Sequence, residues 1–158
     1  MSGSTGSESR ARDPEVLLLA PDLESAWDAF VKAHPEGTFF HLAGWREVLR
    51  RAFGHRTHYL VARAGGKVRG VLPLAEVKSL FFGHSLVSTP FCVYGGIVAA
   101  DETAKAALEA RACALARELG VDHLEMRNRR RQHPDWPVKD LYVTFRKAIV
   151  PDEEANLL

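Results

Sequence analysis

The sequence predicts an α+β domain in which helices flank a mixed, mostly antiparallel sheet. Two features of the chain support this prediction. Strand-like runs meet at Gly65-Gly66, which indicates an antiparallel hairpin because both turn positions accept positive φ. Farther along, a helical pattern over residues 101–119 lies between two short strand-like runs, an order typical of one β–α–β crossover.

The first part of the chain predicts one strand and two helices. Val16–Leu19 is an apolar run between two prolines and suits a short strand. A helix should follow, with Asp22 as its N-cap and apolar residues at helical spacing, and it should end before Pro35. The same spacing predicts a second helix over residues 45–53, ended by Gly54.

The rest of the chain predicts mostly strands. Pro73 should interrupt its strand, because proline cannot donate a hydrogen bond to a ladder. Asp101 is expected to cap the long helix and Gly120 to end it. The further strands are expected at residues 58–64, 67–78, 86–89, 97–99, 123–126 and 142–149.

Composition limits the class of protein. The 158 residues suit one domain, and 21 Lys and Arg against 20 Asp and Glu give a net charge of +1, so no overall field attracts nucleic acid or an anionic membrane. No apolar run is long enough for a membrane span and no secretory signal is present, which predicts a cytoplasmic protein. Cys92 and Cys113 lack ligand-like spacing, so no metal site is expected. Residues 1–14 are Ser- and Gly-rich and predict a disordered tail.

The most unusual local segment is Ser88–Gly96, in which two glycines follow an aromatic residue shortly before the Asp101 helix. Glycines let a backbone approach a ligand closely, and amides near a helix N-terminus favour anionic groups. The alternative is a tight loop with Phe91 and Tyr94 in the core, and the pattern alone favours this alternative because paired glycines mostly mark turns.

Several motifs in order along the chain resemble those of FemAB-type proteins, a branch of the GNAT superfamily of N-acyltransferases. More narrowly, the chain is similar to the FemAB-like proteins found with exosortase (PEP-CTERM) exopolysaccharide systems. The resemblance covers residues 16–149. The motifs are Phe40-His41-Leu42-Ala43-Gly44-Trp45, Tyr59-Leu60-Val61-Ala62, Gly70-Val71-Leu72-Pro73-Leu74, Pro90-Phe91 with Tyr94-Gly95-Gly96, and Leu124-Glu125-Met126-Arg127.

The resemblance implies an acyl-CoA N-acyltransferase-like fold, with a splayed sheet and a ligand cleft where its central strands part. It implies amide formation between an acyl or aminoacyl donor, such as aminoacyl-tRNA, and a small-molecule or peptide-like amine acceptor of cell-envelope or exopolysaccharide metabolism. Better-known members have two tandem domains. Residues 15–150 would then form the first domain of a truncated chain, and residues 151–158 the start of a linker to a second C-terminal domain. The implied substrate-binding residues are Phe91, Tyr94, Gly95, Gly96 and Arg127.

The chain departs from acetyl-CoA-using relatives. It has no basic or amide residue at the right place before Gly95-Gly96, so no cofactor is expected. Amide formation needs a neutral amine and donors for the developing oxyanion. No residue is assigned as catalytic, and the ionisable side chains considered for such a role, each with a structural explanation beside it, are His41, Glu76, Tyr94, Glu125 and Arg127.

Arg127, Arg129, Arg130 and Arg131 form a local basic run. This run either contacts a phosphate-bearing substrate or forms a solvated loop, and the nearby Asp135 and Asp140 favour the loop. Two alternatives to the transferase hypothesis also stay open. One is a non-catalytic binding module with the same fold, and the other is a compact CoA-dependent acetyltransferase.

Overall fold

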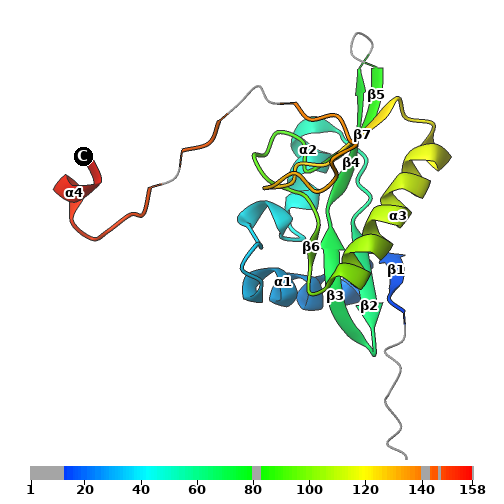
Figure 1. The fold of residues 1–158 in the computed structure, drawn as a ribbon, viewed down its shortest axis with the longest axis horizontal. Coiled ribbons are helices and arrows are strands. Elements are labelled where there is room, and N and C mark those ends of the chain that lie inside the picture. The colour runs from blue at the N-terminus through cyan, green and yellow to red at the C-terminus, as the bar shows by residue number, and fades with distance from the viewer. Residues whose placement is uncertain (1–12, 80–82, 140–142, 146, 158) are drawn as a thin grey trace, which may run out of the picture.

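The computed structural model describes residues 13–79, 83–139, 143–145 and 147–157, and Figure 1 shows their arrangement. Short 3-10 turns lie at Pro21–Leu23 and Phe39–His41. The helices are α1 (Glu24–Ala33), α2 (Trp45–Phe53), α3 (Glu102–Leu119) and α4 (Glu153–Leu157). The strands are β1 (Glu15–Leu18), β2 (Leu60–Ala64), β3 (Lys67–Leu72), β4 (Leu74–Ser79), β5 (Gly83–Ser88), β6 (Val98–Ala99) and β7 (His123–Glu125).

The strands form two sheets that part at Pro73. One sheet has the order β1-β2-β3-β6 and is antiparallel throughout. The other has the order β4-β5-β7, in which β5 pairs antiparallel with β4 and parallel with β7. Pro73 lies between β3 and β4 and has no backbone N–H, so the ladder is interrupted at this residue. Pairing with the segment before β2 resumes directly after it, where the His58 amide donates to the Leu74 carbonyl at 2.7 Å and Thr57 bridges Ala75. Between Ser88 of β5 and Val98 of β6 the chain leaves the sheets. Residues 89–97 of this connection, which contain Gly95 and Gly96, are called the glycine segment below.

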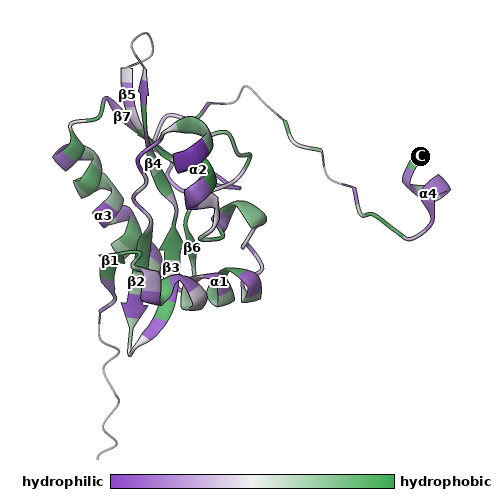
Figure 2. Cartoon of the chain, turned by 180° about the vertical axis from the view of Figure 1, so that it is seen from behind, coloured by the Kyte–Doolittle hydropathy of each residue, from purple (hydrophilic) through white to green (hydrophobic). Residues whose placement is uncertain are grey.

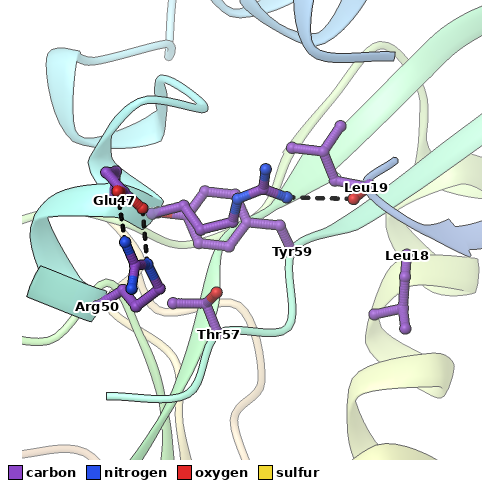
Figure 3. Close-up of a pocket in the computed structure, with 7 residues that line it drawn as sticks. Leu18, Leu19, Glu47, Arg50, Thr57 and Tyr59 are labelled. Carbon is purple, nitrogen blue, oxygen red and sulfur yellow. Dashed lines mark hydrogen bonds and ion pairs between the residues drawn. The ribbon is translucent and has the colours of Figure 1, made fainter. Parts of the chain in front are cut away.

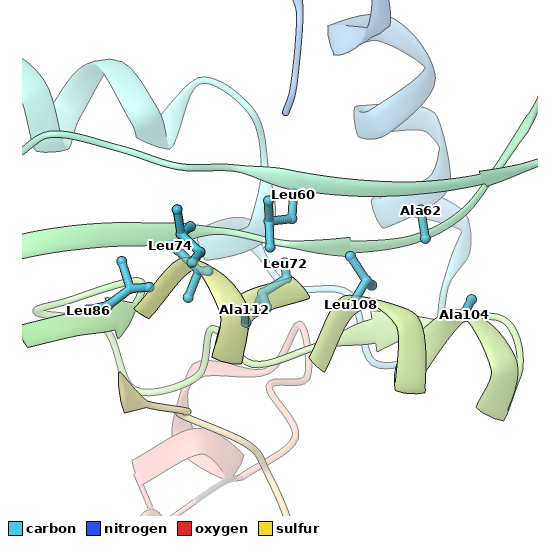
Figure 4. Close-up of a cluster of buried hydrophobic side chains, with 9 residues drawn as sticks. Leu60, Ala62, Leu72, Leu74, Leu86, Ala104, Leu108 and Ala112 are labelled. Atoms are coloured by element: carbon cyan, nitrogen blue, oxygen red, sulfur yellow. The ribbon is translucent and has the colours of Figure 1, made fainter. Parts of the chain in front are cut away.

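Helix α3 covers one face of the strands. Leu60 and Ala62 of β2, and Leu72 of β3, point to this face and pack against Leu108 and other buried residues of α3 (Figure 4). Gly70 of β3 makes the close approach possible, because a Cβ there would lie 2.9 Å from Leu108 Cδ1. This cluster continues onto the second sheet through buried leucines of β4 and β5, so α3 ties the two sheets together.

Helix α1 covers the opposite face of the first sheet. Tyr59 and Val61, which alternate with the residues facing α3, pack here against Trp27 and Val31 of α1. The rings of Trp27 and Tyr59 stack with centroids 5.4 Å apart. Because both faces are covered, every residue from 59 to 62 is buried although the strand is antiparallel.

The predicted α+β class with a mixed, mostly antiparallel sheet flanked by helices is confirmed. Helix α2 has the predicted bounds, and α3 is capped as expected, since the Asp101 carboxylate accepts a hydrogen bond from the Ala104 amide. Asp22 is not a helix N-cap: it lies inside a 3-10 turn that leads into α1, and Leu23 holds the cap position without a side-chain bond.

The prediction of a last strand over 142–149 is wrong for the residues that are described. Residues 143–145 and 147–150 form no strand, and Val143 and Phe145 are exposed. Residues 142 and 146 lie outside the described residues, as does most of the tail predicted over 1–14. The apolar alternation that predicted the strand is real, but no strand in the described part of the chain pairs with these residues.

No helix in the described part of the chain has both the length and the apolar character needed to cross a membrane.

Replacing Leu108 by Ala should lower the free energy of unfolding by about 2–5 kcal/mol, because the side chain is fully buried between α3 and the first sheet. Urea denaturation of the purified chain measures this change. Leu157→Ala is the matched control, since Leu157 is 86% exposed and its loss should change stability little. Equal effects of the two substitutions would contradict the assignment of this core.

Candidate functional site

The segment between β5 and β6 begins with a strained turn. Thr89 and Phe91 have φ of 48° and 66°, values that non-glycine residues rarely adopt. Thr89 is fully buried, whereas the Phe91 side chain is 61% exposed. The Phe91 ring stacks on Phe53 with centroids 4.4 Å apart and lies 5.5 Å from the His55 ring. The turn therefore presents an aromatic ring to solvent at the end of α2.

Gly95 and Gly96 lie inside the fold and are needed there for space. Their amides donate hydrogen bonds of 3.1 and 3.2 Å to the carbonyl of Arg127, which follows β7. A Cβ on Gly95 would overlap the Thr89 side chain, and one on Gly96 would overlap the Asn128 side chain. These two glycines thus fill the space between the parting strands and join β6 to the segment after β7.

Arg127 forms hydrogen bonds to the end of β5, to the turn that follows it and to the end of β7. Its backbone amide donates to Ser88 Oγ at 2.7 Å, and its guanidinium donates to Cys92 O at 2.7 Å and to Glu125 Oε1 at 2.8 Å. The guanidinium is therefore bound to the strained turn and to a carboxylate of its own strand.

His41 fixes the glycine segment to the turn before α2. The ring is buried, and burial lowers its pKa, so the imidazole is neutral. Nδ1 accepts from the Thr38 amide at 3.2 Å, which makes Nε2 the donor to Gly96 O at 3.0 Å. Both ring nitrogens are thus used within the fold, as the capping and packing explanation expects. The Trp27 indole donates to the His41 carbonyl at 2.6 Å and adds to the same cluster.

Glu76 lies in a separate cluster on the second sheet. Its carboxylate is buried and lies 2.8 Å from His58 Nε2, 3.2 Å from His84 Nε2 and 3.1 Å from Lys78 Nζ. Burial by itself would raise the pKa of Glu76, but the hydrogen bonds from these three side chains outweigh it and lower the pKa to about 2. In the described part of the chain, no three His, Cys, Asp or Glu side chains are grouped so that they could hold a metal ion.

A groove of about 480 Å³ opens between the start of α3 and the segment after β7. Ile97, Met126 and Trp136 form the apolar part of a mostly polar lining. Its charged residues are Glu36, Asp101, Glu102, Glu109, Lys105, Arg130 and Arg131. None of Phe91, Tyr94, Gly95, Gly96 and Arg127 lines this groove, but Ile97 directly follows Gly96 and Met126 directly precedes Arg127. The glycine segment therefore lies behind its wall.

The groove contains an imidazole beside a carboxylate. His133 Nε2 lies 2.8 Å from Glu109 Oε1, and the His133 ring stacks on Trp136 with centroids 4.7 Å apart. His133 Nε2 is buried against this carboxylate without a hydrogen bond among the described residues, so Nδ1 is the nitrogen of the ring that can take a proton from an amine. No sequence pattern points to this pair, because Glu109 lies in the middle of α3 and His133 in an irregular loop.

The basic run lies partly on the groove. Arg130 and Arg131 line it, whereas the Arg129 guanidinium lies 5.7 Å from the centroid of the half-buried Tyr94 ring. Arg131 donates from Nε to the His133 carbonyl at 3.0 Å and also bonds to Pro134, so it shapes its own loop. The run was visible in the sequence, but its position opposite α3 depends on the parallel pairing of β5 with β7.

A second pocket, of about 390 Å³, lies between α2 and the end of β1 (Figure 3). Its charged groups bind one another: Arg50 pairs with Glu47 through two hydrogen bonds, and Arg46 donates to the Leu19 carbonyl at 3.2 Å and pairs with Glu24. Charged residues of the groove are paired too, Lys105 with Glu102 and Asp101 with Arg69, so pairing alone does not rank the two pockets.

The comparisons with known proteins support a shared fold for this chain and no family. No family model and no curated protein matches the chain. Among solved structures, the chain is similar to FemX, at 26% identity over 66% of this chain with a TM-score of 0.45, and it spans 24% of that protein's chain. It is also similar to a transcriptional regulator from Bacillus halodurans C-125, at 11% identity with a TM-score of 0.55, covering 86% of this chain and 99% of the regulator. The chain shares its fold with the regulator over almost the whole of that protein.

Replacing Gly95 by Ala should lower the free energy of unfolding by about 1–3 kcal/mol, because the new methyl group would overlap the buried Thr89 side chain. Thermal or urea denaturation measures the loss. Gly44→Ala is the control, since a Cβ at Gly44 meets nothing within 4 Å. If both variants are as stable as the parent, the tight packing of the glycine segment is refuted.

The Glu76 cluster predicts a loss of stability in acid. The pKa of Glu76 is about 2 in the folded chain against an ordinary 4.5, so its contribution is complete above pH 4.5 and disappears as the pH falls towards 2. Glu76→Gln should therefore lower the stability at pH 7 by about 1–3 kcal/mol and weaken its dependence on pH between 4.5 and 2. Urea midpoints across this range measure both effects, with the exposed Glu15→Gln as control. An unchanged pH profile in Glu76→Gln would count against the cluster.

Proposed function

We propose that this chain is the N-terminal half of a FemAB-like N-acyltransferase and that the groove beside α3 receives one of its reactants. The enzyme would form an amide between an acyl or aminoacyl donor and an amine acceptor of cell-envelope or exopolysaccharide metabolism. The observation that carries the proposal is the groove itself. Its apolar and charged side chains come from the start of α3, from β6 and from the segment after β7. Two of the motifs that resemble FemAB-type proteins, Gly95-Gly96 and the one that ends at Arg127, adjoin the lining residues Ile97 and Met126.

The five substrate-binding residues expected from the sequence have two different roles in this proposal. Gly95, Gly96 and Arg127 position the groove wall through the carbonyl that accepts both glycine amides. Phe91 and Tyr94 offer ring surfaces on the outer side of the same segment, where a second reactant would bind.

His133 is the proposed proton acceptor. An attacking amine must lose a proton as the amide forms, and His133 lies in the groove with Glu109 beside its imidazole. Neither His41 nor Glu76 suits this step, because hydrogen bonds within the fold already use both of their side chains.

The charge at the start of α3 favours a donor other than CoA. A pyrophosphate would bind at the amides of this helix end, but the Asp101 carboxylate already accepts from the Ala104 amide at 2.8 Å. That hydrogen bond and the Arg69 side chain lower the pKa of Asp101, so it stays negative, and Glu102 adds a second carboxylate. The compact CoA-dependent acetyltransferase is therefore the weaker candidate.

Titration calorimetry of the chain with an aminoacyl-tRNA and with acetyl-CoA tests the proposal. We expect binding of the aminoacyl-tRNA, with its phosphates beside Arg130 and Arg131 and away from the Asp101 and Glu102 carboxylates, and no micromolar binding of acetyl-CoA. Ala100→Trp places an indole in the groove and should weaken binding about tenfold or more. Ala106→Trp, at an exposed position of α3 that does not line the groove, is the matched control.

Equal binding by the two tryptophan variants would refute the groove as the donor site, and micromolar binding of acetyl-CoA would revive the CoA-dependent alternative. Tyr94→Phe and His133→Gln in a longer chain that contains the second domain separate an enzyme from a binding module. Loss of amide formation with retained binding supports the enzyme, whereas unchanged pathway function in both variants supports the module.

A further inference from the structure

The groove beside α3 contains a stacked aromatic pair. The rings of His133 and Trp136 are both half-buried and both line the groove, with centroids 4.7 Å apart and an interplanar angle of 27°. Among the described residues, no ring other than that of His133 stacks on the Trp136 indole. An indole that borders a groove can stack on a planar ring, and nucleobases of any kind bind aromatic side chains in this way.

The loop that carries this pair is held in shape by Arg131. Its Nε donates to the His133 carbonyl at 3.0 Å, and its guanidinium also donates to the carbonyls of Pro134 and Trp136. Glu109 of α3 fixes the other ring, since its carboxylate lies 2.8 Å from His133 Nε2. The indole is therefore oriented before a ligand arrives, which lowers the entropic cost of binding.

Arg130 is available to bind a phosphate. Its side chain is exposed and lines the groove, and in the described part of the chain no carboxylate or carbonyl binds its guanidinium. A guanidinium can donate to two phosphate oxygens at once. On the opposite side, α3 carries hydrophilic as well as hydrophobic residues (Figure 2), and its carboxylates Glu102 and Glu109 line the groove. These carboxylates repel a phosphate, so the phosphate of a ligand belongs beside Arg130.

Gln132 adds hydrogen-bonding groups to the same wall. Its side chain is exposed, lines the groove and has no partner among the residues that the structure describes. A carboxamide both donates and accepts, as does the edge of a nucleobase. The groove, of about 480 Å³, has the size of a small-molecule site. Its aromatic face, free guanidinium and carboxamide match the base face, the phosphate and the base edge of a nucleotide.

We propose that the groove binds one nucleotide, with its base stacked on Trp136 and its phosphate bound by Arg130. This inference rests on the proposed function for the source of the nucleotide, because an aminoacyl-tRNA carries its amino acid on an unpaired terminal adenosine nucleotide. The aminoacyl group then enters the same groove as His133, the proposed proton acceptor.

An NMR titration of the isotope-labelled chain with AMP tests the stacking. The chain has three Trp residues and so three indole N–H signals, and the signal that is missing in Trp136→Phe belongs to Trp136. AMP should shift this signal and leave that of the fully buried Trp27 in place. AMP should bind about 5- to 100-fold more tightly than ribose 5-phosphate, because the sugar phosphate lacks the base.

Substitutions separate the base from the phosphate. Trp136→Leu should remove the difference between AMP and ribose 5-phosphate, whereas Trp136→Phe keeps a ring and should retain most of it. Arg130→Gln should weaken both ligands by the same factor, with Arg51→Gln, at an exposed position that does not line the groove, as its control. The Trp27 signal reports whether each variant is folded. Equal binding of the two ligands by the parent, or unchanged AMP binding by Trp136→Leu, would overturn the proposal.

Competition with aminoacyl-tRNA distinguishes this inference from the proposed function. AMP should displace the aminoacyl-tRNA, and Trp136→Leu should weaken its binding about fivefold or more. Equal binding of aminoacyl-tRNA by the parent and Trp136→Leu refutes the stacking and leaves the groove as the donor site. AMP that shifts the Trp136 signal without displacing aminoacyl-tRNA, or where aminoacyl-tRNA does not bind, supports the nucleotide site and refutes the tRNA as its source.

Discussion

The missing N–H of Pro73 is the constraint on which the rest of this structure depends. On one side the ribbon of β3 and β4 keeps the same neighbour across Pro73, since β2 pairs with β3 and Thr57, just before β2, bridges Ala75 of β4. On the other side the neighbour changes: β3 pairs with β6 and β4 pairs with β5, and the chain between β5 and β6 leaves the sheet for the stretch 89–97. Helix α3 spans this break, since its buried residues contact leucines of both sheets. The break at Pro73 thus lies between the two sheets, and the buried face of α3 packs against both of them.

The opening is filled by backbone rather than by side chains. Gly95 and Gly96 come close enough to donate to the Arg127 carbonyl because neither has a Cβ. His41 and Ser88 then fix the two ends of this contact through single hydrogen bonds. Such a dense arrangement leaves no vacant space at the glycines themselves, so the groove lies one residue farther along, where Ile97 and Met126 diverge.

Buried ionisable groups serve the fold and exposed ones line the groove. His41 and Glu76 are both enclosed, and each satisfies its hydrogen-bonding atoms within the chain, as a buried polar group must. His133, Glu109 and Lys105 remain partly open to solvent beside the apolar floor of the groove. This division explains why His41 and Glu76, which stand out in the sequence, have structural roles. The pair that can take part in proton transfer, His133 and Glu109, lies in an irregular loop and in the middle of a helix.

The sequence by itself determined the features that depend on near neighbours. Helix α2, the cap of α3 by Asp101, the hairpin at Gly65-Gly66 and the break at Pro73 follow from spacing, capping and proline chemistry within a few residues. Asp22 failed as a cap because the preceding Pro21 starts a 3-10 turn. The tertiary structure alone decided which residues meet across the groove, since Glu109 and His133, or Gly96 and Arg127, are brought together by the parallel pairing of β5 with β7. It also left residues 143–145 and 147–150 outside any strand: alternation specifies a strand face, but a strand forms only where another backbone supplies its hydrogen bonds.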